Sequence, residues 1–162
     1  MSEKLNMKNE KPAIFSLRQA TENDLLFLFK VSTDAMKPVV EALSPDKEFD
    51  NESELAAYKD KFNPEKVEVV QFEGKDVGRL RVVRSSESIY IGGVQILPAF
   101  QGNGIGGAIF KKLIEESKTT NIPIALEVHD VNKQAINFYI KLGFVSGEKV
   151  GNKIVMRYMP NA

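Results

Sequence analysis

The chain has 162 residues, enough to bury one core, and no Ser-, Pro- or Gly-rich linker or internal repeat divides it. Basic and acidic side chains balance at 22 each, so the overall charge gives no reason to expect a nucleic-acid partner. The lack of cysteine excludes a disulfide, a thiolate nucleophile and a cysteine zinc site, and a single histidine leaves little for any other metal centre.

The first residues are polar and contain no apolar signal segment, and the apolar runs that follow are too short to span a bilayer. We therefore expect a cytoplasmic protein that has neither a membrane segment nor a bound metal. Residues 13–160 are predicted to form a single domain, preceded by a flexible segment of residues 1–12.

Capping patterns and prolines set the expected elements of the first third of the chain. Thr21-x-x-Asp24 has the form of a capping box and opens a helix, which Pro38 should interrupt. Asn51-x-x-Glu54 opens a second helix, which should stop before Asn63-Pro64. An initial strand is expected over residues 13–19. The first helix should end at about Met36 and the second at Phe62.

The rest of the chain alternates strand and helix patterns in a definite order. It predicts strands over Val67–Phe72, Val77–Val83, Ile89–Leu97, Ile124–Val128, Phe144–Val150 and Ile154–Met159, and helices over Ile105–Lys118 and Lys133–Leu142. The complete order, βααβββαβαββ, predicts an α/β fold with a mixed, mostly antiparallel central sheet of about seven strands flanked by four helices. Gly92-Gly93 within its strand predicts a bulge or a close approach of another group to the backbone.

A glycine-rich loop, Gln-Gly-Asn-Gly-Ile-Gly at residues 101–106, joins an expected strand to an expected helix. The first turn of a helix has unpaired N–H groups and a partial positive charge, and glycines let an anion approach them closely. The loop therefore predicts a site for a phosphate-bearing ligand.

Spacing separates the ligand classes that use such loops. A nucleotide triphosphate loop would end in Gly-Lys-Ser/Thr, where this chain has Gly106-Gly107-Ala108. A dinucleotide fingerprint is a rival, since Gly102, Gly104 and Gly107 match G-x-G-x-x-G and Glu127 follows at the spacing of a ribose-binding acid. Against it, four residues separate the strand from the first glycine, and too little chain follows Glu127 to complete that fold.

Two sequence blocks resemble the GCN5-related N-acetyltransferase (GNAT) family. Residues 94–106, Val-Gln-Ile-Leu-Pro-Ala-Phe-Gln-Gly-Asn-Gly-Ile-Gly, are similar to its acyl-CoA loop, [Q/R]-x-x-G-x-[G/A], with Gln101, Gly104 and Gly106 at the defining positions. Residues 132–144 then resemble its N-x-x-A-x-x-F-Y-x-x-x-G-F block. The resemblance extends from about Phe15 to Met159 and implies the acyl-CoA N-acyltransferase type of fold.

The resemblance also implies a set of site residues. Tyr139 would be the general acid that serves the departing thiolate, as its free pKa near 10 keeps it protonated at neutral pH. Asn132 and Phe138 would flank the cofactor arm. The pantetheine and pyrophosphate of acetyl-CoA would be held by Ile96, Leu97, Gln101, Gly102, Asn103, Gly104, Ile105 and Gly106.

The base that assists the attacking amine is less defined by the sequence. Some relatives carry a glutamate on the strand before the loop, but Ile89–Leu97 offers only Tyr90 and Gln95. Glu127 is the alternative, as base or as anchor for the amine, and His129 is a weaker one. The expected reaction is direct transfer to a primary amine, in a small molecule or a peptide, within a ternary complex.

Two further points concern the partners of the protein. Between Asp34 and Asp60 eight acidic residues stand against three lysines, which fits a cationic acceptor, although such charge runs on short surface helices are more often plain solvated faces. The alternative function is a non-catalytic acyl-CoA-binding sensor or interaction module. Homodimers are common among such folds, although no apolar stripe marks an interface.

Overall fold

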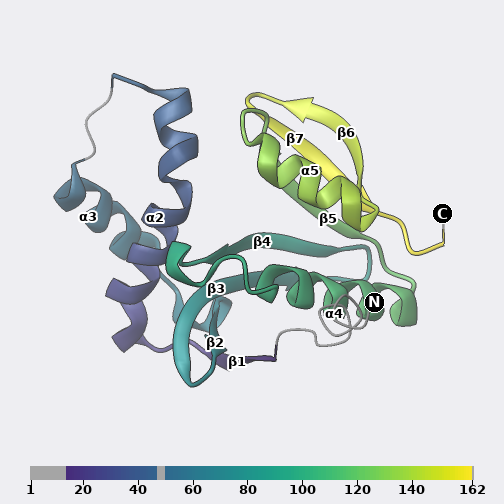
Figure 1. Ribbon diagram of the computed structural model, residues 1–162, viewed down its shortest axis with the longest axis horizontal. Helices are drawn as coiled ribbons and strands as arrows, with labels where there is room; N and C mark the ends of the chain where they lie inside the picture. Colours follow the sequence, from purple (N-terminus) through teal and green to yellow (C-terminus); the bar gives the residue numbers. More distant parts are fainter. Residues whose placement is uncertain (1–13, 47–49, 162) are drawn as a thin grey trace, which may run out of the picture.

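The computed structural model describes residues 14–46 and 50–161 and shows a seven-stranded sheet in the order β1-β2-β3-β4-β5-β7-β6 (Figure 1). All neighbouring strands are antiparallel except β4 and β5, which are parallel. The strands are β1 (Phe15–Gln19), β2 (Glu68–Phe72), β3 (Lys75–Arg84), β4 (Ile89–Ile96), β5 (Ile124–His129), β6 (Val145–Val150) and β7 (Lys153–Tyr158). The helices are α2 (Leu25–Leu43), α3 (Asn51–Lys61), α4 (Ile105–Thr120) and α5 (Lys133–Leu142), with short 3-10 helices η1 (Glu22–Asp24), η2 (Pro64–Lys66) and η3 (Pro98–Phe100).

This element order confirms the fold predicted from the sequence, and α5 has the predicted bounds. Two local predictions are wrong. Helix α2 continues through Pro38 to Leu43, because buried Val39 holds its second half in place although proline removes one helical hydrogen bond. Helix α3 is capped by Asp50, whose side chain accepts from the Glu52 N–H, rather than by Asn51. The expected segment of residues 1–12 lies outside the described residues.

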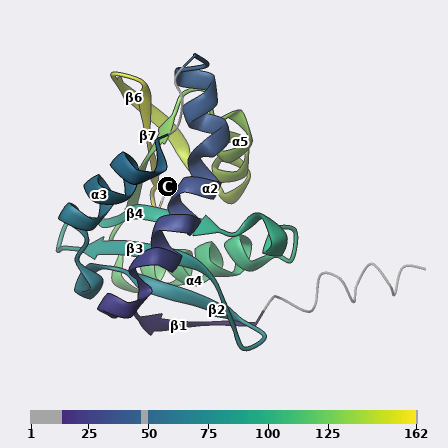
Figure 2. The same cartoon turned by 90° about the vertical axis from the view of Figure 1, so that its left-hand side faces the viewer.

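The helices cover the two faces of the sheet in pairs (Figures 1 and 2). Apolar residues of α4 and α5 join one face in the main core, together with Leu80, Ile91 and Leu126 of the central strands. Residues of α2 and α3 pack on the other face, where Leu28, Val67 and Val69 form a second cluster. Alternation along each strand therefore sends neighbouring side chains into different layers.

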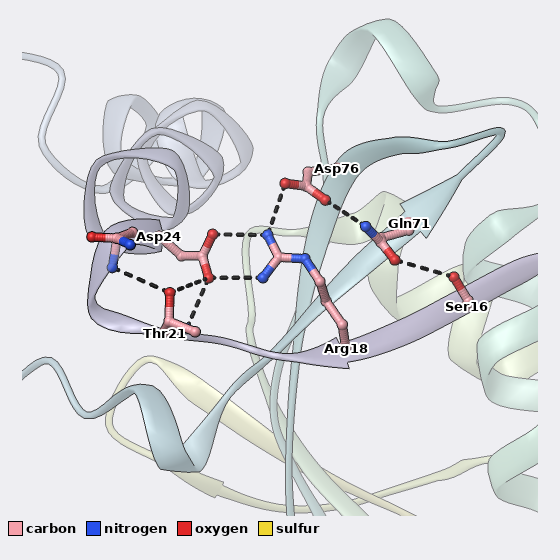
Figure 3. Close-up of polar contacts among 7 residues, drawn as sticks. Ser16, Arg18, Thr21, Asp24, Gln71 and Asp76 are labelled. Carbon is pink, nitrogen blue, oxygen red and sulfur yellow. Dashed lines mark hydrogen bonds and ion pairs between the residues drawn. The ribbon is translucent and has the colours of Figure 1, made fainter.

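A polar network fixes the α2 lobe to the sheet (Figure 3). Arg18 of β1 donates to both carboxylate oxygens of Asp24, at 2.8 and 2.9 Å, and to Asp76 at 2.8 Å. Asp24 also accepts from the N–H of Thr21 in the predicted capping box. Hydrogen bonding to Arg18 lowers the pKa of Asp24 to about 2, so this carboxylate is charged near neutral pH. The network sets where α2 begins above the sheet.

Candidate functional site

The two halves of the sheet separate between β4 and β5. These parallel strands pair only where Ile89–Ile91 lies beside Ile124–Leu126, and beyond Ile91 they diverge (Figure 1). The register against β3 also shifts here, where Val82 pairs with Ile91 and Arg81 with Gly93. Gly92 is the extra residue of a β-bulge, which confirms the predicted irregularity.

A cavity of about 810 Å³ opens at this divergence, between α2, β4, β5, α4 and α5. We call it the cleft. Most of the predicted site residues line it: Ile96, Gln101, Gly102, Gly104, Ile105, Gly106, Glu127, Asn132, Phe138 and Tyr139. Leu97 and Asn103 do not. The Leu97 N–H donates to the Val77 carbonyl at 2.8 Å, and the Asn103 side chain donates to the Phe100 carbonyl at 2.9 Å.

The glycine-rich loop brings the N-terminus of α4 to the cleft. Gly104 is the N-cap in a left-handed conformation (φ 79°) and provides no side-chain cap, so the first N–H groups of α4 are left for another acceptor. Gln101 braces the loop by donating to the Ile96 carbonyl at 2.9 Å. The start of α4 thus combines free donors with the positive end of the helix dipole.

Two glycines in the first turn of α4 have no packing reason to be glycine. A Cβ atom at Gly106 would meet only the Phe138 ring, at 3.9 Å, and one at Gly107 would meet nothing within 4 Å. Neither residue has a positive φ. Because glycine costs a helix roughly 1 kcal/mol relative to alanine, free space over this backbone needs another explanation, such as the close approach of a ligand.

Helix α5 places an aromatic hydroxyl at the cleft. Asn132 caps the helix by accepting from the Ala135 N–H at 3.3 Å, and Gly143 ends it in a left-handed conformation. The Tyr139 ring lies among phenylalanine rings, with centroid distances of 5.4 Å to Phe110 and 5.6 Å to Phe144. Burial raises the pKa of Tyr139 to about 12, so the hydroxyl remains a proton donor at neutral pH.

Polar groups reach the cleft from the α2 side of the sheet. Glu127 of β5 alternates with buried Leu126 and Val128, and its side chain is 38% exposed, with Lys153 Nζ 3.9 Å from its Oε1. Tyr90 on β4 lies outside the cleft lining, and burial and the charge of Glu127 raise its pKa. These residues face the lobe formed by α2 and α3.

Two further polar side chains line the cleft. His129 has a buried Nδ1 with no hydrogen-bond partner among the described residues. Asp34 of α2 forms an ion pair with Lys30 at 2.6 Å. With Glu127, these two residues form what we call the polar wall of the cleft.

Sequence reasoning missed two arginines beside the cleft. Arg79 and Arg81 of β3 alternate with Leu80 and therefore lie on the α2 side, where they cover the glycines of β4. A Cβ atom at Gly93 would lie 2.5 Å from Nη1 of Arg79. The signal was present in the sequence as an Arg-x-Arg strand opposite a Gly-Gly strand.

Two other features bear on the kind of site. Within residues 14–46 and 50–161, no group of three or more His, Cys, Asp or Glu side chains is placed to hold a metal ion. No helix in the same residues is long and apolar enough to cross a membrane.

The splayed sheet and the donor-rich loop define the acyl-CoA N-acyltransferase class of fold. The chain belongs to the acetyltransferase (GNAT) family, whose pattern it matches over residues 36–144. It is by family an acetyl-CoA-dependent N-acetyltransferase, with acetyl-CoA as co-substrate. Comparison with curated proteins found no significant match.

Solved structures share this fold at low sequence identity. The PaiA N-acetyltransferase of Thermoplasma acidophilum in complex with coenzyme A is 16% identical, with a TM-score of 0.70 over 90% of this chain and 99% of that one. The ribosomal-protein-S18-alanine N-acetyltransferase of Escherichia coli is 16% identical, with a TM-score of 0.63 over 92% and 96%. Arabidopsis thaliana Naa50 with the bisubstrate analogue CoA-Ac-MVNAL is 19% identical, with a TM-score of 0.61 over 88% and 97%.

Proposed function

We propose that the cleft binds acetyl-CoA along β4 and the start of α4, and that it transfers the acetyl group directly to a primary amine that enters from the α2 side. The observation that carries this proposal is the divergence of β4 from β5, which opens directly onto the free N-terminus of α4. Residues 13–160 would act as one catalytic domain.

The residues at the cleft suit the parts of acetyl-CoA. The pyrophosphate would accept hydrogen bonds from N–H groups of Gly104, Ile105 and Gly106, where the helix dipole favours an anion. The pantetheine arm would pair with the backbone of β4 beyond Ile91, which β5 leaves without a partner, as an added strand does. Gln101, Gly102 and Asn103 would shape the loop, and Leu97 would hold the end of β4 against Val77 of β3. Ile96 would guide the arm, and Asn132 with Phe138 would flank it.

Tyr139 would donate its proton to the thiolate that leaves when the amine displaces it from the acetyl group. The pKa of about 12 suits this role, because the hydroxyl is neutral before the reaction and lies among rings that exclude water. With no cysteine in the sequence, a direct attack within a ternary complex is the simplest path.

The amine must lose a proton before it attacks. An alkylammonium with a pKa near 10.4 has only about one neutral molecule in a few thousand at pH 7, a barrier of roughly 4 to 5 kcal/mol. Glu127 would hold this ammonium or accept its proton, as it lies at the cleft on the side from which the acceptor enters. The acceptor would be a small molecule or a peptide.

Calorimetric titration with acetyl-CoA, and with NADH and NAD⁺ in parallel, tests the ligand of the cleft. We expect micromolar binding of acetyl-CoA and none of the dinucleotides. Binding of a dinucleotide instead would favour the rival explanation of Gly102, Gly104 and Gly107. A screen of amines with detection of the released thiol then separates an enzyme from an acyl-CoA-binding sensor, which would bind acetyl-CoA but release no thiol in the presence of any amine.

A further inference from the structure

Two arginines beside the cleft have no acidic partner among the described residues. The chain has five arginines, and three form ion pairs: Arg18 with Asp24 and Asp76, Arg84 with Glu116, and Arg157 with Glu148. Arg79 and Arg81 form none within the described chain, although both lie in the centre of the sheet. Their charges therefore differ from the other three in having no ion-pair partner there.

The environment of Arg79 makes its charge costly. Its Nη1 donates to Oε1 of Gln95 at 2.5 Å, a neutral acceptor, while its Nε is buried without a hydrogen-bond partner in the described residues. Burial lowers the pKa of Arg79; Tyr58 acts in the opposite direction, and the like charge of Arg81 lowers it. A buried guanidinium that lacks an anionic partner costs free energy, so an anion that binds beside Arg79 would stabilise it.

The position of the pair points to the acceptor side of the cleft. Arg79 and Arg81 lie above Gly93 and Gly92, which line the cleft, and they share the face of the sheet on which α2 packs. The N-terminus of α4 and the helix α5 lie on the opposite face. A pyrophosphate at the start of α4 would therefore be bound from the other side of the sheet.

The acidic groups of the same wall already have cationic neighbours. Asp34 is paired with Lys30 at 2.6 Å, and Glu127 has Lys153 at 3.9 Å. Of the acidic residues described between Asp34 and Asp60, only Asp34 lines the cleft. The acidic residues noted in the sequence therefore lie largely outside the lining of the cleft, whereas the charges of Arg79 and Arg81, unpaired within the described residues, lie beside it, over Gly93 and Gly92.

We propose that the acceptor is an amine that also carries an anionic group, a carboxylate or a phosphate, and that Arg81, supported by Arg79, binds this group. The inference rests on the proposed function and names the substrate class of the same site. Arginine suits the role because its planar fork binds carboxylate or phosphate with two parallel hydrogen bonds.

The test compares matched acceptors that differ in one anionic group. The pairs are L-phenylalanine and L-phenylalaninamide, O-phosphoethanolamine and ethanolamine, and a hexapeptide with acidic side chains and its amide counterpart, with spermidine as a polycation. Thiol release gives kcat/KM for each. We expect the wild-type protein to prefer the anionic member of at least one pair by roughly tenfold or more, and the preferred pair separates carboxylate from phosphate.

Arg81→Gln should lower kcat/KM for the preferred anionic acceptor roughly 10- to 100-fold and leave KM for acetyl-CoA unchanged. Arg79→Gln should act in the same direction, with its folding checked by thermal melting. Arg84→Gln is the matched control, since Arg84 lies on the same strand but pairs with Glu116 of α4, outside the cleft. It should alter neither parameter.

A preference for spermidine or the neutral amines, or an Arg81→Gln variant with unchanged selectivity, would overturn the proposal. If the wild-type protein acetylates no amine of the panel, thermal shifts of the CoA-saturated protein decide. Stabilisation by the anionic members that Arg81→Gln abolishes supports the inference, and no stabilisation by any of them overturns it. Failure of the proposed function would be recognised by a different observation, namely the absence of acetyl-CoA binding in calorimetry.

Discussion

The guanidinium of Arg81 occupies the space above Gly92 that a Cβ atom at that position would need. Gly92→Ala should therefore displace this guanidinium, the far end of a flexible side chain, and leave the fold intact. The expected result is a loss of kcat/KM for anionic acceptors, roughly tenfold, with a nearly unchanged melting temperature.

Gly78→Ala provides the structural contrast. A Cβ atom there would meet the backbone carbonyl of Gln95 on β4, which cannot move without disturbing the sheet. We expect a loss of unfolding free energy of about 1 to 3 kcal/mol, measured by denaturant unfolding. Equal stability of the two variants would contradict the view that a Cβ atom meets a movable side chain at Gly92 but fixed backbone at Gly78.

Tyr139→Phe tests the general acid. Removing the hydroxyl should lower kcat roughly 100-fold and leave the Kd for acetyl-CoA within about twofold, because the ring packing against Phe110 and Phe144 is kept. Since the pKa of Tyr139 is about 12, its deprotonation should cause no decline in rate below roughly pH 11. An unchanged kcat with an acceptor that the wild-type protein uses would show that Tyr139 is not the general acid.

Gly106→Val tests the free space at the start of α4. A Cβ atom there meets only Phe138, at 3.9 Å, and valine is a better helix former than glycine, so the free energy of unfolding should change by less than about 1 kcal/mol. The Kd for acetyl-CoA should rise tenfold or more, because the side chain fills the space over the helix N–H groups. Gly106→Ala should give an intermediate Kd, and an unaltered Kd in both variants would place the phosphate elsewhere.

The ion pair between Arg18 and Asp24 predicts how stability depends on pH. The folded protein lowers the pKa of Asp24 from 3.8 to about 2, so this carboxylate stabilises the fold fully above about pH 4. The contribution, about 2 kcal/mol, should be lost as the pH falls from about 4 to 2.

Asp24→Asn should remove most of this acid-dependent term, measured by chemical unfolding between pH 2 and 7. Asp76→Asn is the matched control, because Asp76 binds the same guanidinium but is 34% exposed against 12% for Asp24. Its effect should be smaller. A parallel pH dependence of wild-type protein and Asp24→Asn would contradict the role given to this pair.

The sequence predicted the order of elements because each element carries its own local signal. The helix α5, for example, has a capping Asn132 and a terminating Gly143, and its predicted bounds match the structure. Pro38 misled the prediction, since the local cost of proline was outweighed by the packing of Val39. Local patterns fix where an element begins more reliably than they show how tertiary contacts extend it.

Some residues of the cleft were also predictable, because they carry local sequence signals. The glycine loop and Tyr139 lie in continuous motifs, whereas Arg79 and Arg81 matter only through the strand opposite them. Their significance depends on register, on the bulge at Gly92 and on the lack of an acidic partner among the described residues. None of these follows from the spacing of residues along one segment.

Glu127→Gln separates the two roles open to this carboxylate. Its side chain is accessible and already lies 3.9 Å from the ammonium of Lys153, an environment that suits a second ammonium group from the acceptor. We therefore expect KM for the acceptor to rise roughly tenfold, while kcat changes less than threefold and the Kd for acetyl-CoA is unaffected. Glu148→Gln is the control, because Glu148 pairs with Arg157 away from the cleft. A fall in kcat at constant KM would show instead that Glu127 is the base, and unchanged values of both would exclude it from the site.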